Sequence, residues 1–226
     1  MRTLLMPVFL LAVGTATAQD TDTPDYFDPE RFEADILGFE QADSAEGRID
    51  DAVLFYGSSS IRMWHDSLEY DLAPLPVTAR GFGGSTMIDA LNYADRVVIP
   101  RKPRTIVLYE GDNDVGQYGV SPERVTELFE AFVQKVHASL PETKIYFIAI
   151  KPSPSRWEHW PAMNETNELI RAVCDDNPLL HYVDVASPML NEDGTPRTDI
   201  FLEDMLHLNR DGYLMWKLVV RNALLE

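Results

Sequence analysis

The stretch DAVLFYGSSSIRMW, residues 51–64, decides the fold of this chain. Residues 53–56 form an unbroken run of strand-forming side chains, which is typical of a strand buried on both faces of a parallel sheet. Gly57 interrupts this run, three serines follow it, and the residues after them can open a helix. A serine at such a junction lies over the carboxyl edge of an α/β sheet, where ligands bind. Ser59 is therefore a candidate nucleophile, although a serine in this position is more often only an N-cap.

The rest of the chain repeats this alternation of apolar runs with helical patterns. The sequence predicts further strands at residues 77–80, 105–109, 144–150 and 181–185. Helices are expected from Pro29 to a polar loop at 42–48, and at 64–73, 87–98, 121–136, 162–175 and 208–224. This alternation predicts one three-layer α/β/α domain with a five-stranded, mainly parallel sheet. Right-handed crossovers would place the strand-to-helix loops along one edge of that sheet.

The N-terminus has the pattern of a signal peptide. A positive Met1-Arg2 pair precedes an apolar stretch at residues 4–13, and small residues at 16–18 form a cleavage site. The apolar stretch is too short to span a bilayer. We expect residues 1–18 to be removed from an exported protein, either periplasmic or secreted. Residues 19–50 would then form a lead-in and an N-terminal helix, and residues 51–226 the catalytic domain.

Charge and cysteine content exclude several classes of partner and cofactor. The formal net charge of −18 argues against binding to nucleic acid or to anionic membrane surfaces, although acidity also serves solubility. No segment after the leader is apolar enough for a membrane helix. Cys174 is the only cysteine, so no internal disulfide is expected, and no Cys or His pairs have zinc-site spacing. We expect neither a metal nor a cofactor.

Acyl transfer would require a base, an orienting carboxylate and oxyanion donors around Ser59. His207 is the candidate base because imidazole titrates near neutral pH, and Asp204 lies close enough to hold one ring nitrogen. The backbone N–H groups of Ser59 and Gly84 and the side-chain amide of Asn113 are candidate oxyanion donors.

Each of these candidates also has a structural interpretation. Asp204 and His207 could form a local cap, the glycines before Ser85 a tight turn, and Asn113 an Asx-turn. His159, which lies between two tryptophans, could line a pocket, whereas the remaining histidines suit surface or core positions.

Four short blocks resemble those of the SGNH hydrolases, also called the GDSL esterase/lipase superfamily. They are Gly-Ser-Ser at 57–59, Gly-Phe-Gly-Gly at 81–84, Gly-Asp-Asn-Asp at 111–114 and Asp-Met-Leu-His at 204–207. The resemblance implies a flavodoxin-like SGNH fold, a triad of Ser59, His207 and Asp204, and an oxyanion hole of Ser59, Gly84 and Asn113. The usual Asp of Gly-Asp-Ser is Ser58 here, which leaves Ser58 and Ser60 as rival nucleophiles.

The family resemblance implies an esterase. The lack of an apolar lid segment and the expected export favour short-chain or acetyl esters, since small clefts suit short acyl groups. The tryptophans favour such esters on carbohydrate, because aromatic faces stack on sugar rings. Trp64, Trp157, Arg62 and Arg156 are candidate substrate contacts, although the tryptophans could equally pack the loops. A lysophospholipase or acyl thioesterase is the alternative within the family. An exported carbohydrate-binding protein without activity is the alternative from another class.

Overall fold

The computed structural model describes residues 24–47 and 52–225. Its five strands form one sheet in the order β2-β1-β3-β4-β5, and each pair of neighbours is parallel. The strands are β1 Val53–Gly57, β2 Val77–Gly81, β3 Thr105–Tyr109, β4 Lys144–Ile148 and β5 Leu180–Val183. The five-stranded parallel sheet expected from the sequence is therefore confirmed. The predicted signal peptide, residues 1–18, lies outside the described residues.

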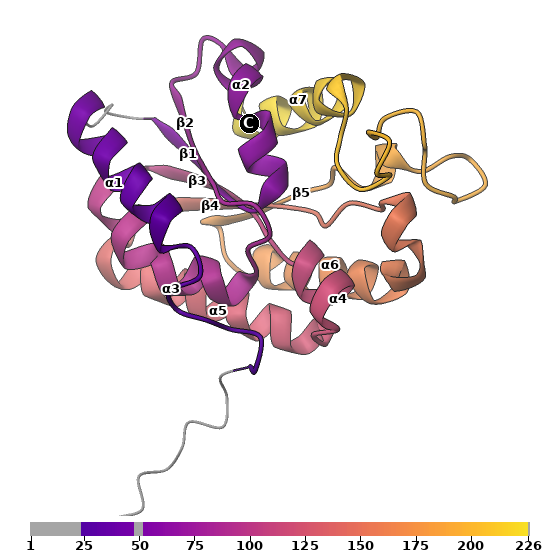
Figure 1. Cartoon of the computed structure of the whole chain (residues 1–226), viewed down its shortest axis with the longest axis horizontal. Helices are drawn as coiled ribbons and strands as arrows, with labels where there is room; N and C mark the ends of the chain where they lie inside the picture. Colours follow the sequence, from indigo (N-terminus) through magenta and orange to yellow (C-terminus); the bar gives the residue numbers. More distant parts are fainter. Residues whose placement is uncertain (1–23, 48–51, 226) are drawn as a thin grey trace, which may run out of the picture.

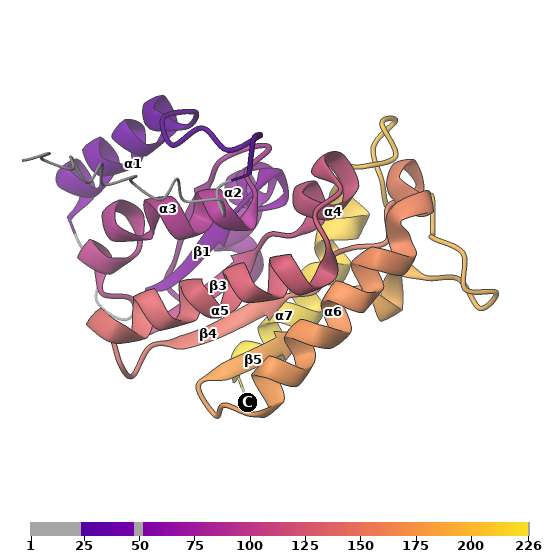
Figure 2. The ribbon, with the colours of Figure 1, turned by 90° about the horizontal axis from the view of Figure 1, so that it is seen from below.

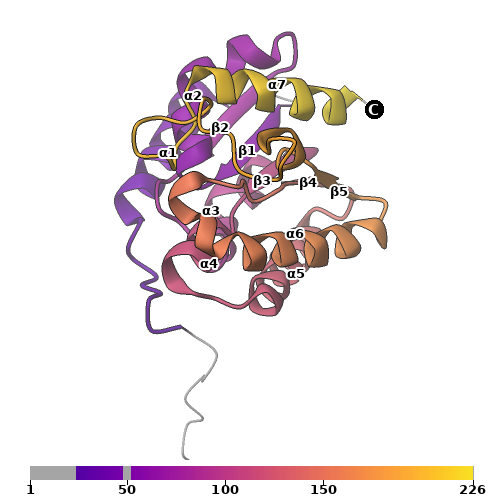
Figure 3. The same cartoon turned by 90° about the vertical axis from the view of Figure 1, so that its right-hand side faces the viewer.

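Helices cover both faces of the sheet (Figures 1 and 3). The α-helices are α1 Glu33–Glu46, α2 Ser59–Leu72, α3 Met87–Val97, α4 Asp112–Tyr118, α5 Pro122–Ser139, α6 Trp160–Asp175 and α7 Arg210–Leu225. Short 3-10 helices are η1 Ile99–Arg101, η2 Pro154–His159 and η3 Ser187–Met189. Helices α2 and α7 lie on one face, and α3, α5 and α6 lie side by side on the other, with α1 outside α3 (Figure 2).

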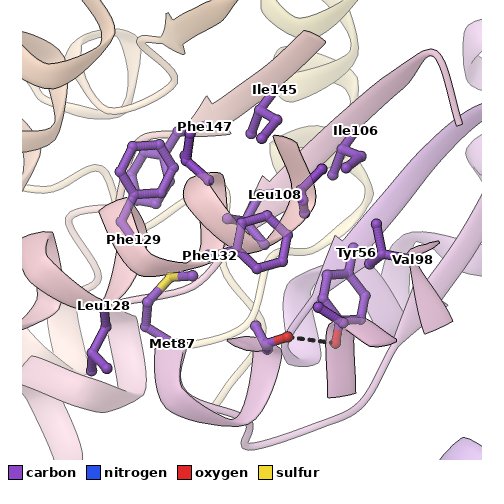
Figure 4. Close-up of a cluster of buried hydrophobic side chains, with 14 of the residues drawn as sticks. Tyr56, Met87, Val98, Ile106, Leu108, Leu128, Phe129, Phe132, Ile145 and Phe147 are labelled. Carbon is purple, nitrogen blue, oxygen red and sulfur yellow. Dashed lines mark hydrogen bonds between the residues drawn. The ribbon is translucent and has the colours of Figure 1, made fainter. Parts of the chain in front are cut away.

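The two cores follow from the alternation of side chains along the buried strands. In β1, Leu54 and Tyr56 enter the core beneath α3 and α5, whereas Phe55 enters the core beneath α2 and α7. Figure 4 shows part of the first core, where Phe129 and Phe132 of α5 meet side chains of the central strands. Because both faces are covered, these strands carry continuous apolar runs, as the sequence analysis expected.

Three local features differ from the sequence-based expectations. Helix α1 begins at Glu33, since the Asp28 carboxylate accepts from the Glu30 N–H in a preceding turn, and it continues through part of the predicted loop at 42–48. Helix α4 was not predicted, because it is short and contains a glycine. The proline-rich loop at 151–157 is partly the 3-10 helix η2. Within the described ranges, none of the helices combines the length and apolar character that crossing a membrane requires.

Candidate active site

The junction between β1 and α2 depends on Gly57. Its φ of +138° is unfavourable for a side chain, and a Cβ there would lie 2.1 Å from the Tyr109 carbonyl oxygen of β3. The Ser58 N–H donates to that same carbonyl at 3.1 Å, and α2 begins at Ser59. Ser59 is thus fixed at the first helical position, where backbone N–H groups have no intrahelical acceptor.

Ser59, His207 and Asp204 form one hydrogen-bonded chain. His207 Nε2 lies 3.0 Å from Ser59 Oγ, and Nδ1 lies 2.6 Å from Asp204 Oδ2. An ionised carboxylate can only accept, so Nδ1 carries the proton, and a neutral ring leaves Nε2 to accept from the serine. This is the arrangement of nucleophile, base and orienting carboxylate that acyl transfer requires.

The turn that holds Asp204 favours its ionised form. Oδ1 accepts from the backbone N–H groups of Leu206 and His207, both at 2.9 Å. Partial burial raises the pKa of Asp204, but hydrogen bonds from the His207 ring and from these backbone groups outweigh it and lower the pKa to about 2. Met205 adopts a left-handed conformation in this turn, with φ of 55°, and its carbonyl accepts from the Ser155 N–H at 3.0 Å.

Burial distinguishes Ser59 from its two neighbours. Ser58 and Ser60 are each 1% exposed, whereas Ser59 is half-buried. Among the described residues Ser60 Oγ has no hydrogen-bond partner. A substrate entering from solvent can therefore reach Ser59 but neither rival serine.

The candidate oxyanion donors leave the sheet beside Ser59. Gly57 is in register with Gly81 of β2 on one side and Tyr109 of β3 on the other, so the chain segments that follow all three strands emerge together. Gly84 has a φ of +88°, which favours glycine. Asn113 Nδ2 donates to the Ser85 carbonyl at 2.8 Å and so joins these two segments.

Asn113 is held from behind by Arg156, which sequence analysis had assigned to substrate binding. Arg156 Nη2 donates to Asn113 Oδ1 at 3.0 Å, and Nη1 donates to Asp112 Oδ1 at 2.6 Å. The Arg156 side chain is only 13% exposed. Asp112 and Asn113 occupy these guanidinium nitrogens, which favours a role in holding Asn113, and the substrate contact of Arg156 stays a prediction.

Asp112 also forms a buried ion pair with Lys151, which sequence analysis missed. The Asp112 and Lys151 side chains are 5% and 1% exposed, and Asp112 Oδ2 also accepts from the Tyr109 hydroxyl at 3.0 Å. Burial raises the pKa of Asp112, but the charges of Lys151 and Arg156 lower it to about 2. The sequence did contain a signal for Lys151. This lysine directly follows a predicted apolar strand, at the edge of the sheet where the other candidate residues lie.

The structure contradicts the substrate contact that the sequence analysis expected of Trp64. Trp64 is fully buried, and its indole N–H donates to Asp71 at 2.9 Å, so it faces the α2–α7 core.

Arg62 and Trp157 are the two remaining candidate contacts. Arg62 is exposed, and its guanidinium lies so close to Gly83 that a Cβ there would meet Nη1 at 2.9 Å. Trp157 is half-buried and stacks on Trp160 with ring centroids 6.0 Å apart. His159 Nε2 lies 3.6 Å from Glu158 Oε1.

Across residues 24–47 and 52–225 no group of three or more His, Cys, Asp or Glu side chains is placed to hold a metal ion. Cys174 is buried, and burial raises the pKa of its thiol to about 12, which makes it unreactive.

Comparisons with known proteins bear on both the family and the fold. The model of the GDSL-like Lipase/Acylhydrolase family matches residues 43–215. Over 169 residues the chain is 28% identical to platelet-activating factor acetylhydrolase IB subunit alpha1 of Homo sapiens, which covers 71% of this chain and 70% of that protein.

Solved structures share the fold. A GDSL-like lipase from Bacteroides thetaiotaomicron superposes with a TM-score of 0.72 at 19% identity, covering 84% of this chain and 97% of that one. An acetylxylan esterase from Geobacillus stearothermophilus superposes with a TM-score of 0.61 at 14% identity, covering 78% and 94%.

Proposed function

The chain belongs to the GDSL-like lipase/acylhydrolase family, and from this premise we propose that it is a serine esterase that cleaves short-chain or acetyl esters. The observation that carries the proposal is the chain of hydrogen bonds through His207, 3.0 Å to Ser59 and 2.6 Å to Asp204. Each group needed to activate a serine is present in the correct order.

In the proposed mechanism, Ser59 Oγ attacks the carbonyl carbon of the ester while His207 Nε2 takes the hydroxyl proton. Asp204 keeps the ring in the required tautomer and stabilises the imidazolium that forms. The negative charge that develops on the carbonyl oxygen is bound by the N–H groups of Ser59 and Gly84 and by Asn113 Nδ2. His207 then gives its proton to the departing alcohol. Water repeats the same steps on the acyl-enzyme and releases the acid.

The preference for an acetyl group rests on two relatives whose names contain that group. One is a platelet-activating factor acetylhydrolase subunit and the other an acetylxylan esterase. The half-buried Trp157 and the exposed Arg62 are the groups we propose to contact the alcohol part of the ester. A carbohydrate ester is consistent with contacts from both Trp157 and Arg62. The negative net charge of the chain disfavours a polyanionic substrate. We also propose that the protein acts outside the cytoplasm, and this proposal is supported only by the signal-peptide pattern of residues 1–18.

A second candidate, hydrolysis of esters or thioesters with longer apolar chains, is favoured by two exposed side chains. Leu202 precedes the Asp204–His207 turn and Met205 lies within it, and the two residues are 40% and 37% exposed. An apolar chain leaving the site across this turn would cover them.

The test is hydrolysis of p-nitrophenyl esters from acetate to dodecanoate by the parent chain and by its Ser59→Ala and Ser60→Ala variants. The proposal expects the parent and Ser60→Ala to cleave acetate fastest, and Ser59→Ala to be inactive although folded. Faster cleavage of long-chain esters would favour the second candidate. Binding of sugars without cleavage of any ester, including acetylated xylo-oligosaccharides, would contradict the proposal and indicate a carbohydrate-binding protein.

A further inference from the structure

The hydrogen bonds of Asn113 fix the direction of its free N–H. Its Oδ1 accepts from Arg156 Nη2 at 3.0 Å, and one hydrogen of Nδ2 is donated to the Ser85 carbonyl at 2.8 Å. A guanidinium can only donate and a carbonyl can only accept, so the amide cannot be flipped without losing both bonds. One hydrogen of Nδ2 is left over, and its direction is set by these two partners.

Arg156 is itself fixed by a buried charge cluster. Its Nη1 donates to the main-chain oxygen of Asp112 at 2.9 Å and to Oδ1 at 2.6 Å. The other carboxylate oxygen of Asp112 is occupied by Lys151 and by the Tyr109 hydroxyl. Two cationic groups thus surround one carboxylate directly behind Asn113. Because the side chains of Asp112 and Lys151 are almost fully buried, water screens these charges little.

The backbone of α4 is shaped to admit Arg156. Gly116 lies inside this helix, where alanine is ordinarily more favourable. A Cβ at Gly116 would lie 2.5 Å from Arg156 Cδ, 3.1 Å from its Nε and 2.7 Å from Met163 Cε. The glycine therefore makes room for the arginine side chain. This steric observation is independent of the hydrogen bonds of the guanidinium.

We propose that Arg156 is a positioning residue that orients and polarises the Asn113 amide as an oxyanion donor, and that the Asp112–Lys151 pair and Gly116 hold it there. The inference rests on the proposed esterase function. A cation bonded to the amide oxygen draws electron density from the nitrogen and strengthens the remaining N–H as a donor. Arg156 itself does not touch the substrate.

A double-mutant cycle on p-nitrophenyl acetate hydrolysis tests this proposal. Asn113→Ala is expected to lower kcat by about 10²–10³, the usual cost of removing an oxyanion donor. Arg156→Met is expected to lower kcat by about tenfold, which corresponds to the loss of one charge-assisted hydrogen bond, with KM nearly unchanged. In the Asn113→Ala background, Arg156→Met should then lower kcat by less than about twofold, because no amide remains to be positioned.

Two further measurements separate positioning from folding. Gly116→Ala displaces Arg156 without removing it and should lower kcat in the same way as Arg156→Met. Gly38→Ala is the matched control, since Gly38 lies on the exposed face of α1 with nothing within 4 Å of a Cβ, and it should leave kcat unchanged. Guanidinium chloride at non-denaturing concentration should restore part of the kcat of Arg156→Ala, whereas methylammonium chloride should not.

The outcomes are distinguishable from failure of the esterase assignment. Equal effects of Arg156→Met with and without the Asn113 side chain would overturn the inference while leaving the esterase intact. An effect confined to KM would do the same and return Arg156 to substrate binding. A folded parent chain that hydrolyses no ester, and so does not differ from Ser59→Ala, would overturn both proposals together.

Discussion

Replacing Asp112 by asparagine isolates the buried charge cluster behind the candidate oxyanion site. The variant keeps the shape of the side chain but leaves Lys151, which is 1% exposed, without a counter-charge. Removing one member of a buried ion pair costs about 3–5 kcal/mol. We therefore expect Asp112→Asn to lower the free energy of unfolding by about 3 kcal/mol or more at pH 7, and to lower kcat because Arg156 loses its anchor.

Part of this loss of stability depends on pH, and the pKa of Asp112 determines whether it grows or shrinks as the pH falls. Interaction with Lys151 and Arg156 lowers that pKa from 3.8 to about 2, which is worth about 2 kcal/mol. A lowered carboxyl pKa stabilises the fold above the pKa of the unfolded chain, and this stabilisation is lost as pH falls through the folded value. The part of the stability difference that comes from ionisation of Asp112 should therefore be fully present above about pH 5 and shrink between pH 4 and pH 2.

The assay is urea unfolding followed by circular dichroism, for the parent, Asp112→Asn, Lys151→Met and the double variant. The double variant leaves Arg156 without its carboxylate but removes the charge of Lys151, which is the more deeply buried cation, so it should be more stable than Asp112→Asn alone. Two results would refute the reasoning: a double variant whose loss equals the sum of the single losses, or a stability difference that does not shrink towards pH 2.

Three further predictions concern other parts of the chain. Trp64→Phe removes the indole N–H bonded to Asp71, and should lower the free energy of unfolding by about 1–3 kcal/mol while kcat for p-nitrophenyl acetate is unchanged; an altered kcat would contradict the buried position of Trp64. Gly84→Ala places a Cβ at a φ of +88° and 3.3 Å from Arg31 Nη2, and should lower kcat by roughly tenfold as the amide donor shifts; full activity would exclude Gly84 from oxyanion binding. The Cys174 thiol should react with a disulfide reagent only after unfolding in urea, and rapid labelling of the folded chain would disagree with its burial.

The position of a residue could be predicted from the sequence where it belongs to a simple apolar pattern or directly follows a strand. The apolar runs at 53–56 and 105–109 indicated buried strands because a sheet covered on both faces requires them. Ser59 and Asn113 follow strands that proved to be neighbours in the sheet, so their common edge followed from right-handed crossovers.

The direction of single side chains was harder to predict. Trp64 is five residues after Ser59, and at about 100° per residue the two point about 140° apart around α2, so a helical-wheel argument would have placed it in the core. No such argument was available for Arg156 and Lys151. Their partner, Asp112, lies about 40 residues earlier on a different strand end, and only the folded sheet brings these charges together.

The central claim is that Ser59 is the nucleophile, and the most direct test is mass spectrometry after treatment with a fluorophosphonate. Trypsin places Ser58, Ser59 and Ser60 in one peptide that ends at Arg62, so fragmentation of that peptide must locate the adduct. We predict one adduct per chain, on Ser59, that is lost in Ser59→Ala and formed much more slowly in His207→Ala. An adduct on Ser58 or Ser60, or ester hydrolysis that persists in Ser59→Ala, would contradict the account.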